Sequence, residues 1–218
     1  MDLFSLSWTA LRTAVSSLTA QDMELPSGCR GWLVRDLVCH LVIDAQDVLI
    51  TLATPAQGAA TADAATYWDV LAGPPDGEDP LDALIPRLAA AYGDHRLLQF
   101  HLEDLGAAAG RAAAQVDPEL LVGTKDRVLR AGDYLQAYVL EWTLHHLDLG
   151  AHRPALEPPP AASLSAARRL LERILGAPLP ERIPDADALL IGTGRRMPSP
   201  AQVEQLGELA PRLPLILG

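Results

Sequence analysis

The sequence predicts a mainly α-helical fold: a four-helix bundle over residues 1–175, followed by a small α/β appendage over residues 176–218. Apolar residues recur at helical spacing through most of the chain. One long connection, rich in Pro and Gly, interrupts this pattern, as in bundles with a crossover connection. The chain shows no internal repeat. Four principal helices with one long connection favour a bundle.

Five segments have helical periodicity, and the first four form the predicted bundle. They span residues 3–20, 33–52, 80–115, 133–151 and 162–175. Pro26, Gly28 and Gly31 separate the first segment from the second. The third segment is long and rich in Ala and Leu, and we expect Gly93 or Gly106 to kink it.

The regions between and after these helices carry weaker signals. The long connection includes one expected helical turn near Tyr67–Leu71. The stretch "LLVGTKDRVLRAGDY" has β character and leads into the fourth helix. The tail, "PDADALLIGTGRRMPSPAQVEQLG", predicts a short strand, a Gly-Arg loop and a helix. In that last helix Ser199, Pro200 and Gln202 fit an N-cap, a first helical residue and a capping-box partner.

Composition excludes several classes of protein. Hydrophobic residues make up 49% of the chain and charged residues 21%, which indicates a globular protein. The formal charge of −11 argues against nucleic acid or an anionic membrane as a partner, because both require clustered Lys and Arg. No apolar run approaches the ~18 residues of a membrane span, and the N-terminus lacks the pattern of a secretory signal. We therefore expect a soluble, cytoplasmic protein.

The fourth predicted helix carries a polar stripe on an otherwise apolar segment. It contains no Lys or Arg between Gly132 and Gly150, so it should be largely buried. Residues three and four apart share one helix face, and here they are Tyr134, Tyr138, Glu141, His145 and Asp148. A buried glutamate must be neutral, paired or bound to a metal. The alternative is a solvated face, although such a face normally includes Lys and Arg.

The two adjacent histidines of "EWTLHHLDLG" fall on different faces of this helix. At ~100° per residue, His145 lies about 40° from Glu141 around the helix axis, whereas His146 lies about 140° away. Glu141 and His145 can therefore bind one ion together. His146 falls beside Trp142 and Leu149, so we interpret it as a core histidine.

The second predicted helix offers a matching stripe, formed by Asp36, His40, Asp44 and Asp47. If the second and fourth helices face each other, His40 joins Glu141 and His145 in a set of two histidines and one carboxylate. Such a set leaves coordination positions open, as catalytic zinc and non-haem iron sites require. Asp44 and Asp47 are expected to be solvated, although Asp44 could orient His40 as an acceptor from behind. Asp36 near the helix start is explained by its favourable interaction with the helix dipole.

Three stretches of the chain resemble a known family. "GCRGWLVRDLVCHL" resembles the W-x-V-R-D-L-x-x-H-L signature of the DinB/YfiT-like proteins, in their mycothiol-dependent maleylpyruvate isomerase branch. "EWTLHHLDLG" is similar to the E-x-x-x-H-x-x-D-L segment of that branch, and "LLIGTGRR" to its Thr-Gly-Arg element. One departure is Leu33, where the family usually has Ser or Thr, so the helix cap should differ.

The resemblance implies a DinB-like four-helix bundle that binds a divalent metal through His40, Glu141 and His145. Zinc is the first expectation, with nickel or iron as alternatives. It further implies mycothiol or a related small thiol as cosubstrate, and thus an S-transferase or isomerase acting on a small electrophile. Arg195 or Arg196 could bind a carboxylate of substrate or thiol, unless they form an ordinary surface turn. Asp148 would support the ligands as an acceptor.

Other functions stay open at this point. One is a non-catalytic metal- or ligand-binding bundle in stress response; another is a zinc-type anti-sigma regulator, whose H-x-x-x-C-x-x-C pattern is absent. The two cysteines are expected to play minor parts: Cys39 as a small buried hydrophobe, and Cys29 as a loop residue with little sign of reactivity. The apolar helices are also compatible with a homodimer.

Overall fold

The computed structural model describes residues 2–73 and 83–217 of the chain. The helices in these ranges are α1 (Leu3–Ser16), α2 (Ala20–Met23), α3 (Val34–Leu52), α4 (Leu84–Ala91), α5 (His95–Gln115), α6 (Ala131–Gly150), α7 (Ala161–Leu175), α8 (Asp185–Gly192) and α9 (Pro200–Leu206), with a 3-10 helix η1 (Gly207–Arg212). The strands are short: β1 (Val70–Leu71), β2 (Leu121–Thr124), β3 (Arg127–Arg130) and β4 (Ile216–Leu217). No helix in the described ranges is both long and apolar enough to cross a membrane.

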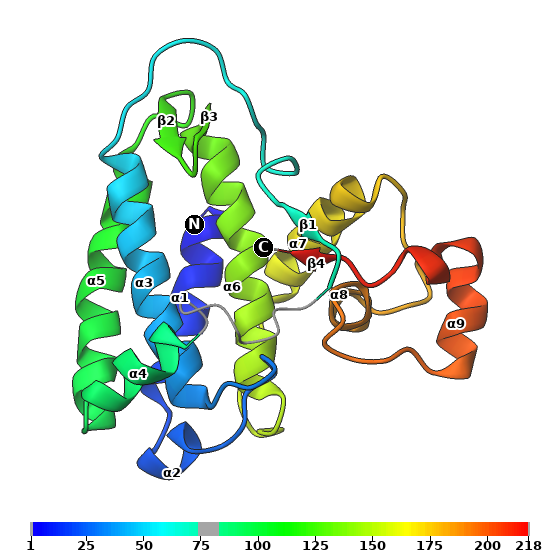
Figure 1. Ribbon diagram of the computed structural model, residues 1–218, viewed down its shortest axis with the longest axis horizontal. Helices are drawn as coiled ribbons and strands as arrows, with labels where there is room; N and C mark the ends of the chain where they lie inside the picture. The colour runs from blue at the N-terminus through cyan, green and yellow to red at the C-terminus, as the bar shows by residue number, and fades with distance from the viewer. Residues whose placement is uncertain (1, 74–82, 218) are drawn as a thin grey trace.

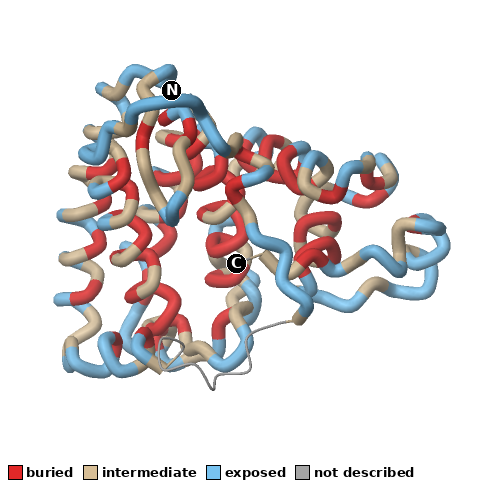
Figure 2. Tube along the Cα trace, turned by 45° about the horizontal axis from the view of Figure 1, so that its top comes forward, coloured by how far each residue is buried: buried red, intermediate tan, exposed pale blue. Residues whose placement is uncertain are grey.

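Helices α1, α3, α5 and α6 stand side by side and form the predicted four-helix bundle (Figure 1). Their inward faces are buried, as the colouring of Figure 2 shows. The centre of this core holds two stacked indole rings, Trp8 of α1 and Trp142 of α6, whose centroids lie 3.9 Å apart. The helical periodicity of the sequence therefore identified the bundle and its core faces correctly.

The prediction of one continuous helix over residues 80–115 is wrong. The chain breaks between α4 and α5 at Gly93, whose φ of +66° is a left-handed conformation that glycine adopts without strain. Asp94 then starts α5 by accepting a hydrogen bond from the Arg96 amide, at 2.9 Å. Gly106 does not break α5; it lets Trp8 approach, because a Cβ there would lie 2.6 Å from the indole. Residues 80–82 lie outside the described ranges.

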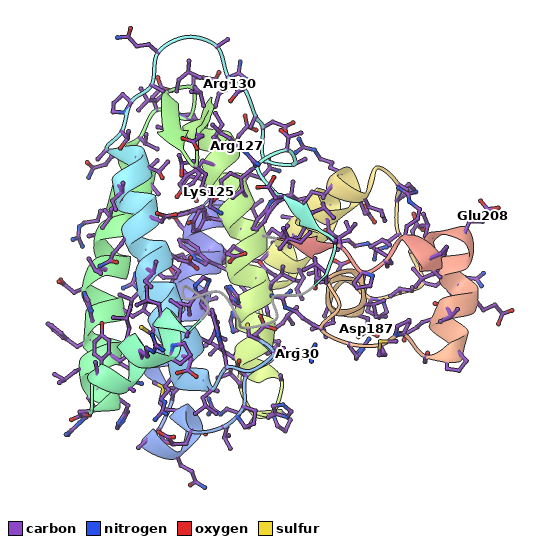
Figure 3. The ribbon with its side chains drawn as sticks, in the orientation of Figure 1. Arg30, Lys125, Arg127, Arg130, Asp187 and Glu208 are labelled. Atoms are coloured by element: carbon purple, nitrogen blue, oxygen red, sulfur yellow. The ribbon has the colours of Figure 1, made fainter. Side chains whose placement is uncertain are left out.

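The stretch with β character forms a hairpin, β2 and β3, paired antiparallel. Lys125 and Asp126 at its tip both have positive φ, which matches the twist of a tight hairpin turn. Arg127 donates hydrogen bonds to carbonyls of the long connection, including that of Thr66 at 2.9 Å, and Figure 3 labels it with Lys125 near the start of α6. The expected helical turn in this connection lies at residues 64–67, just before β1. The hairpin thus holds the connection against the bundle.

The tail differs from its prediction in one element. The expected strand in "DADALLIG" is the helix α8, which follows Pro184 and has Asp185 and Asp187 in its first turn. A short apolar run cannot be assigned by periodicity alone, and here the acidic first turn favours the helix. A strand does occur, at β4, where it pairs with β1 of the long connection. The capping box at Ser199 is confirmed.

A second hydrophobic cluster joins the tail to the bundle. Leu144 of α6, Leu171 of α7 and Leu189 of α8 are all buried in it. This cluster lies on the opposite side of α6 from the bundle core, so α6 is covered on both sides. The division of the chain at residue 175 stays a prediction, although shared apolar packing crosses it.

Candidate metal centre

The start of α3 sets the position of His40. Leu33 occupies the N-cap and has no capping side chain, but Asp36 accepts a hydrogen bond from the Leu33 amide, at 2.9 Å. Asp36 therefore caps the helix directly, beyond the dipole effect expected from the sequence. One turn further on, the His40 ring packs beside Trp32, with centroids 5.3 Å apart. The departure at Leu33 thus leaves the helix start intact.

The structure brings His40, Glu141 and His145 together, as the facing-helix argument predicted. Glu141 Oε1 lies 3.0 Å from His145 Nε2 and 3.5 Å from His40 Nε2. The two imidazole rings meet edge to face, with centroids 4.9 Å apart. Asp44 completes the group: its Oδ2 lies 3.6 Å from His40 Nε2. One possible ligand atom from each of these four residues lies within 4.8 Å of the other three.

A second group of polar side chains lies behind His145. Asp148 Oδ2 accepts a hydrogen bond from His145 Nδ1, at 3.0 Å. Arg195 Nε donates to both oxygens of the same carboxylate, at 2.8 and 3.0 Å. Asp148 is fully buried, so these donors provide the compensation that a buried carboxylate requires. Asp148 is therefore placed where the sequence predicted an acceptor, and Arg195 is anchored by it.

Cys29 is the site residue that sequence reasoning missed. Its thiol donates to Asp148 Oδ2, at 3.2 Å, and lies 3.7 Å from His145 Nδ1. Burial raises the pKa of this thiol, so it is a protonated donor at neutral pH. A cation among Cys29, His145 and Asp148 would face the guanidinium of Arg195, which argues for a hydrogen-bonded cluster there. The signal in the sequence was the position of Cys29 three residues before Trp32, where the signature of the second helix begins.

Gly28 explains how this loop reaches α6. Its amide donates to the backbone carbonyl of Asp148, at 2.9 Å. A Cβ at Gly28 would lie 2.4 Å from Asp148 Oδ1 and 2.8 Å from its Cα, so only glycine fits. The close approach carries Cys29 to the Asp148 carboxylate.

Opposing charges govern the protonation of the cluster. Burial raises the pKa of Glu141, but the charge and hydrogen bond of His145, with help from His40, hold it well below its usual value. Burial likewise lowers the pKa of His145, and the charge of Glu141 raises it well above 6.5. Burial raises the pKa of Asp44 to about 6. Asp148 has a pKa of about 2, because Arg195 and then His145 outweigh its burial. These shifts favour negatively charged Glu141 and Asp148 on either side of a positively charged His145.

His146 lies apart from the cluster, as the helical-wheel argument predicted. It is 3% exposed, and its Nε2 donates to the backbone carbonyl of Glu157, at 2.9 Å. Burial lowers the pKa of His146, so the neutral imidazole is favoured. It is a core histidine with a satisfied hydrogen bond.

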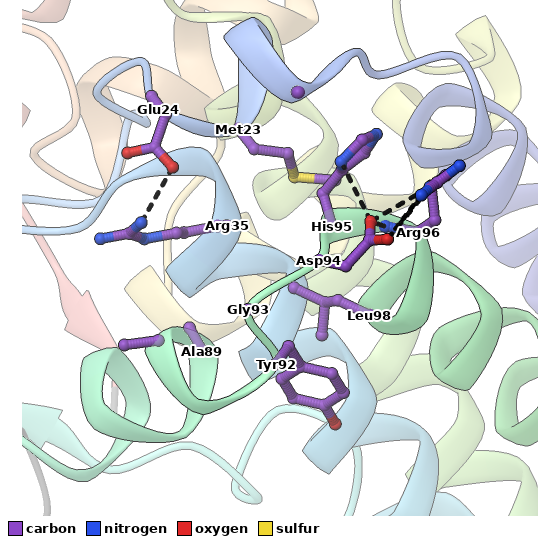
Figure 4. Close-up of a pocket in the computed structure, with 12 residues that line it drawn as sticks. Met23, Glu24, Arg35, Ala89, Tyr92, Gly93, Asp94, His95, Arg96 and Leu98 are labelled. Carbon is purple, nitrogen blue, oxygen red and sulfur yellow. Dashed lines mark hydrogen bonds and ion pairs between the residues drawn. The ribbon is translucent and has the colours of Figure 1, made fainter.

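Two clefts flank the bundle, and they differ in their relation to the cluster. One, of about 580 Å³, lies along the end of α6 and is lined in part by Asp148, Arg195 and Arg196. The other, of about 530 Å³, lies at the break between α4 and α5 (Figure 4). Its rim carries the Arg35–Glu24 ion pair. None of the four clustered residues lines either cleft, but the first is lined by Asp148 and Arg195, which lie behind His145.

The fold and the site define a class: a helical bundle in which two facing helices bring two histidines and two carboxylates together. Comparison with protein families places the chain within this class. The chain belongs to the family described as mycothiol maleylpyruvate isomerase N-terminal domain, whose model matches residues 4–150. This confirms the resemblance seen in the sequence. The match contains the four clustered residues and ends at the last residue of α6, before Arg195.

A solved structure shows the same fold. The crystal structure of the mycothiol-dependent maleylpyruvate isomerase is 17% identical in sequence, with a TM-score of 0.59. The likeness covers 89% of this chain and 87% of that one, so it extends beyond the bundle into the tail. A comparison with curated proteins finds none that matches. The predicted fold class is therefore confirmed.

Proposed function

We propose that this protein is a metal-dependent enzyme that uses a small thiol of the mycothiol type to isomerise, or to conjugate, a small electrophile. The observation that carries the proposal is the convergence of His40, Glu141 and His145 from α3 and α6, in a chain whose family is named for a mycothiol-dependent isomerase. The identity of the electrophile is part of the proposal, and maleylpyruvate is the first candidate.

The donor set fits a divalent cation. Imidazole nitrogens suit zinc, iron and nickel, and a carboxylate adds charge compensation. His145 also has the support that metal-binding histidines usually have, because Asp148 accepts a hydrogen bond from its other ring nitrogen. We propose zinc as the resident ion, with nickel and iron as alternatives. A cation in this place would favour the thiolate form of a bound thiol and polarise a substrate carbonyl.

The side chains of the site would hold the cation and bind the charged groups of the substrate and the thiol. His40, Glu141 and His145 would hold the cation, and Asp148 keeps the Nδ1 proton of His145, so that Nε2 faces Glu141. Because Asp148 bonds to Nε of Arg195, the two Nη groups form the fork that would bind a carboxylate of substrate or thiol. The cleft of about 580 Å³ beside Arg195 would take the body of the ligand.

The proposed isomerisation balances without loss of thiol. The thiolate adds to an alkene carbon conjugated with a carbonyl, and the π electrons move to the carbonyl oxygen as an enolate. The former double bond then rotates, the enolate expels the thiolate, and the alkene returns in the other geometry. Conjugation differs only in the last step, where protonation of the enolate leaves the new C–S bond in place.

The test begins with metal analysis of the purified protein. We expect one equivalent of a divalent metal, lost in His40→Ala. Mycothiol, bacillithiol and glutathione are then offered with maleylpyruvate and with electrophilic alkenes. Isomerisation without thiol loss, or conjugation with thiol loss, supports the proposal. If metal is bound but no substrate changes with any thiol, the protein is a non-catalytic metal-binding bundle.

A further inference from the structure

We infer that Asp44 is a fourth protein ligand of the metal, in direct contact with it, and not an outer carboxylate that orients His40. The inference rests on the proposed metal centre and deepens it. It concerns a residue on α3 that the sequence assigned to a supporting part, and three observations carry it.

The first observation is which ring nitrogen Asp44 faces. An outer carboxylate accepts a hydrogen bond from the histidine nitrogen that does not bind the metal. Asp148 has this relation to His145, since it meets Nδ1 while Glu141 meets Nε2. Asp44 instead faces His40 Nε2, the same nitrogen that faces Glu141. It therefore lies on the side of His40 where the metal would bind.

The second observation is the spacing. Hydrogen bonds from nitrogen to oxygen are about 2.7–3.2 Å long. Asp44 Oδ2 lies 3.6 Å from His40 Nε2, and Glu141 Oε1 lies 3.5 Å from the same atom, so both separations are too long. Ligands held about 2.0–2.1 Å from one tetrahedral ion lie about 3.3–3.4 Å from each other. The separations therefore suit neighbouring ligands better than hydrogen-bonded partners.

The third observation is an uncompensated buried oxygen. The Asp44 side chain is only 10% exposed, and its Oδ2 has no hydrogen-bond partner in the part of the chain that the structure describes. The ionisable groups around it include two further carboxylates, Glu141 and Asp47, as well as His40 and His145. A buried carboxylate without a donor is costly, and crowding with like charges adds to the cost. A divalent cation among these groups removes both costs.

The consequence is a different coordination shell. Two imidazoles and two carboxylates give four protein ligands, and the two carboxylates balance the charge of a divalent ion. A tetrahedral shell would then be full, as in structural zinc sites. Entry of a thiol would require a five- or six-coordinate ion, or release of Asp44. Zinc expands to five ligands in catalytic sites, so thiol entry is compatible with the proposed zinc ion as well as with nickel or iron.

Cobalt(II) is the probe for the test, because its visible absorption reports coordination number and geometry. Metal-free full-length protein is titrated with cobalt(II) as wild type, Asp44→Ala and Asp44→Asn, and each spectrum is recorded at saturation, so that affinity and geometry are read separately. Asp148→Asn serves as the outer-carboxylate comparison and Asp47→Asn as the matched control on the same helix. Circular dichroism verifies folding of each variant.

We expect Asp44→Ala to change the bands at saturation and to weaken cobalt affinity by more than the roughly 10- to 100-fold typical of an outer partner. Asp148→Asn should weaken affinity without changing the bands, and Asp47→Asn should do neither. Bands that are unchanged in both Asp44 variants would overturn the inference and leave the metal centre standing. If wild type binds no cobalt, or if His40→Ala binds it equally well, the proposed metal centre fails first.

Discussion

Two histidine–carboxylate pairs flank Glu141, one on each of the facing helices. On α6, Asp148 lies behind His145, where Arg195 and Cys29 also donate to it. On α3, Asp44 lies in front of His40, and its Oδ2 has no such donor among the described residues. The two pairs use the same residue types at similar helical spacing. The α6 carboxylate has its hydrogen-bond donors within the chain, whereas the partner of the α3 carboxylate would be the proposed cation.

The difference shows that the role of each carboxylate depends on which ring nitrogen of its histidine it faces. Helical spacing places a carboxylate and a histidine on one face, but it does not select Nδ1 or Nε2. The carboxylate at i+3 from His145 reaches Nδ1, and the one at i+4 from His40 reaches Nε2. Each outcome depends on the ring orientation, which tertiary neighbours set.

Arg195→Leu should give the largest change in stability, because it leaves the Asp148 carboxylate buried without its cation. We expect a loss of about 3–5 kcal/mol of unfolding free energy at pH 7. Asp148 has a pKa of about 2 in the folded protein, below the unfolded value near 3.9, so it stabilises the fold above pH ~4 and loses this effect as pH falls towards 2. The gap between variant and wild type should therefore narrow in acid.

Urea unfolding at pH 7 and pH 3 measures this gap. Arg195→Lys keeps a positive charge and should lose less stability than the leucine variant. A gap that is equally wide at both pH values would show that Arg195 acts through packing, and that the α6 pair does not depend on its charge.

His145→Ala should distinguish the α6 pair from the α3 pair, because His145 contacts Asp148 as well as the proposed metal ligand Glu141. We expect loss of metal and, in EDTA-treated protein, a loss of about 2 kcal/mol from the hydrogen bonds to Glu141 and Asp148. His40→Ala should lose the metal equally but change metal-free stability by less than about 1 kcal/mol. Metal analysis and urea unfolding check both. Equal destabilisation of the two metal-free variants would contradict the asymmetry of the pairs.

Gly28→Ala tests the close approach that brings Cys29 to Asp148. The new Cβ would clash with the carboxylate and with the backbone of Asp148, so we expect a loss of roughly 1–2 kcal/mol and weaker metal binding. Gly150→Ala is the matched control, because a Cβ there meets nothing within 4 Å. The control should be neutral or slightly stabilising. A similar effect of both substitutions on metal affinity would argue against this route to the site.

Helical periodicity made part of the site predictable. It placed His145 beside Glu141 and separated it from His146, because these relations depend only on the angle per residue. It also showed a matching stripe on α3, but that α3 faces α6 was a condition of the argument, since it depends on tertiary packing. It could not place Gly28 or Cys29, because these residues lie in a loop that has no periodicity. Their contacts with Asp148 of α6 also join positions about 120 residues apart in the sequence.

The elements of the fold that the sequence did not predict also depend on contacts or conformations without a local pattern. Gly93, which the sequence offered only as one of two possible kinks, breaks the chain between α4 and α5 through its positive φ, and the Ala-rich sequence on either side favours a continuous helix. The strand predicted in place of α8 reflects an apolar run that fits either state. The strand that does form, β4, pairs with β1, and no local pattern indicates a partner about 146 residues away.

The adjacent histidines of α6, His145 and His146, should have opposite effects on how the unfolding free energy changes with pH. Burial lowers the pKa of His146 below the unfolded value near 6.5, so His146 stabilises the fold above that pH, and the effect fades as pH falls. His145 has a raised pKa in metal-free protein, so its contribution is complete below pH ~6.5 and is lost as pH rises through its folded pKa. Neighbours in sequence should thus oppose each other.

His146→Gln should reveal this opposition with a small effect. Glutamine can still donate to the Glu157 carbonyl but does not titrate, so the variant should lose less unfolding free energy than wild type between pH 7 and pH 5. Unfolding free energies in urea, with EDTA present, give the comparison, and His145→Gln should shift the same slope in the other direction. If both substitutions shift it in one direction, the two histidines share an environment, and the division of α6 into a polar face and a core face is wrong at this turn.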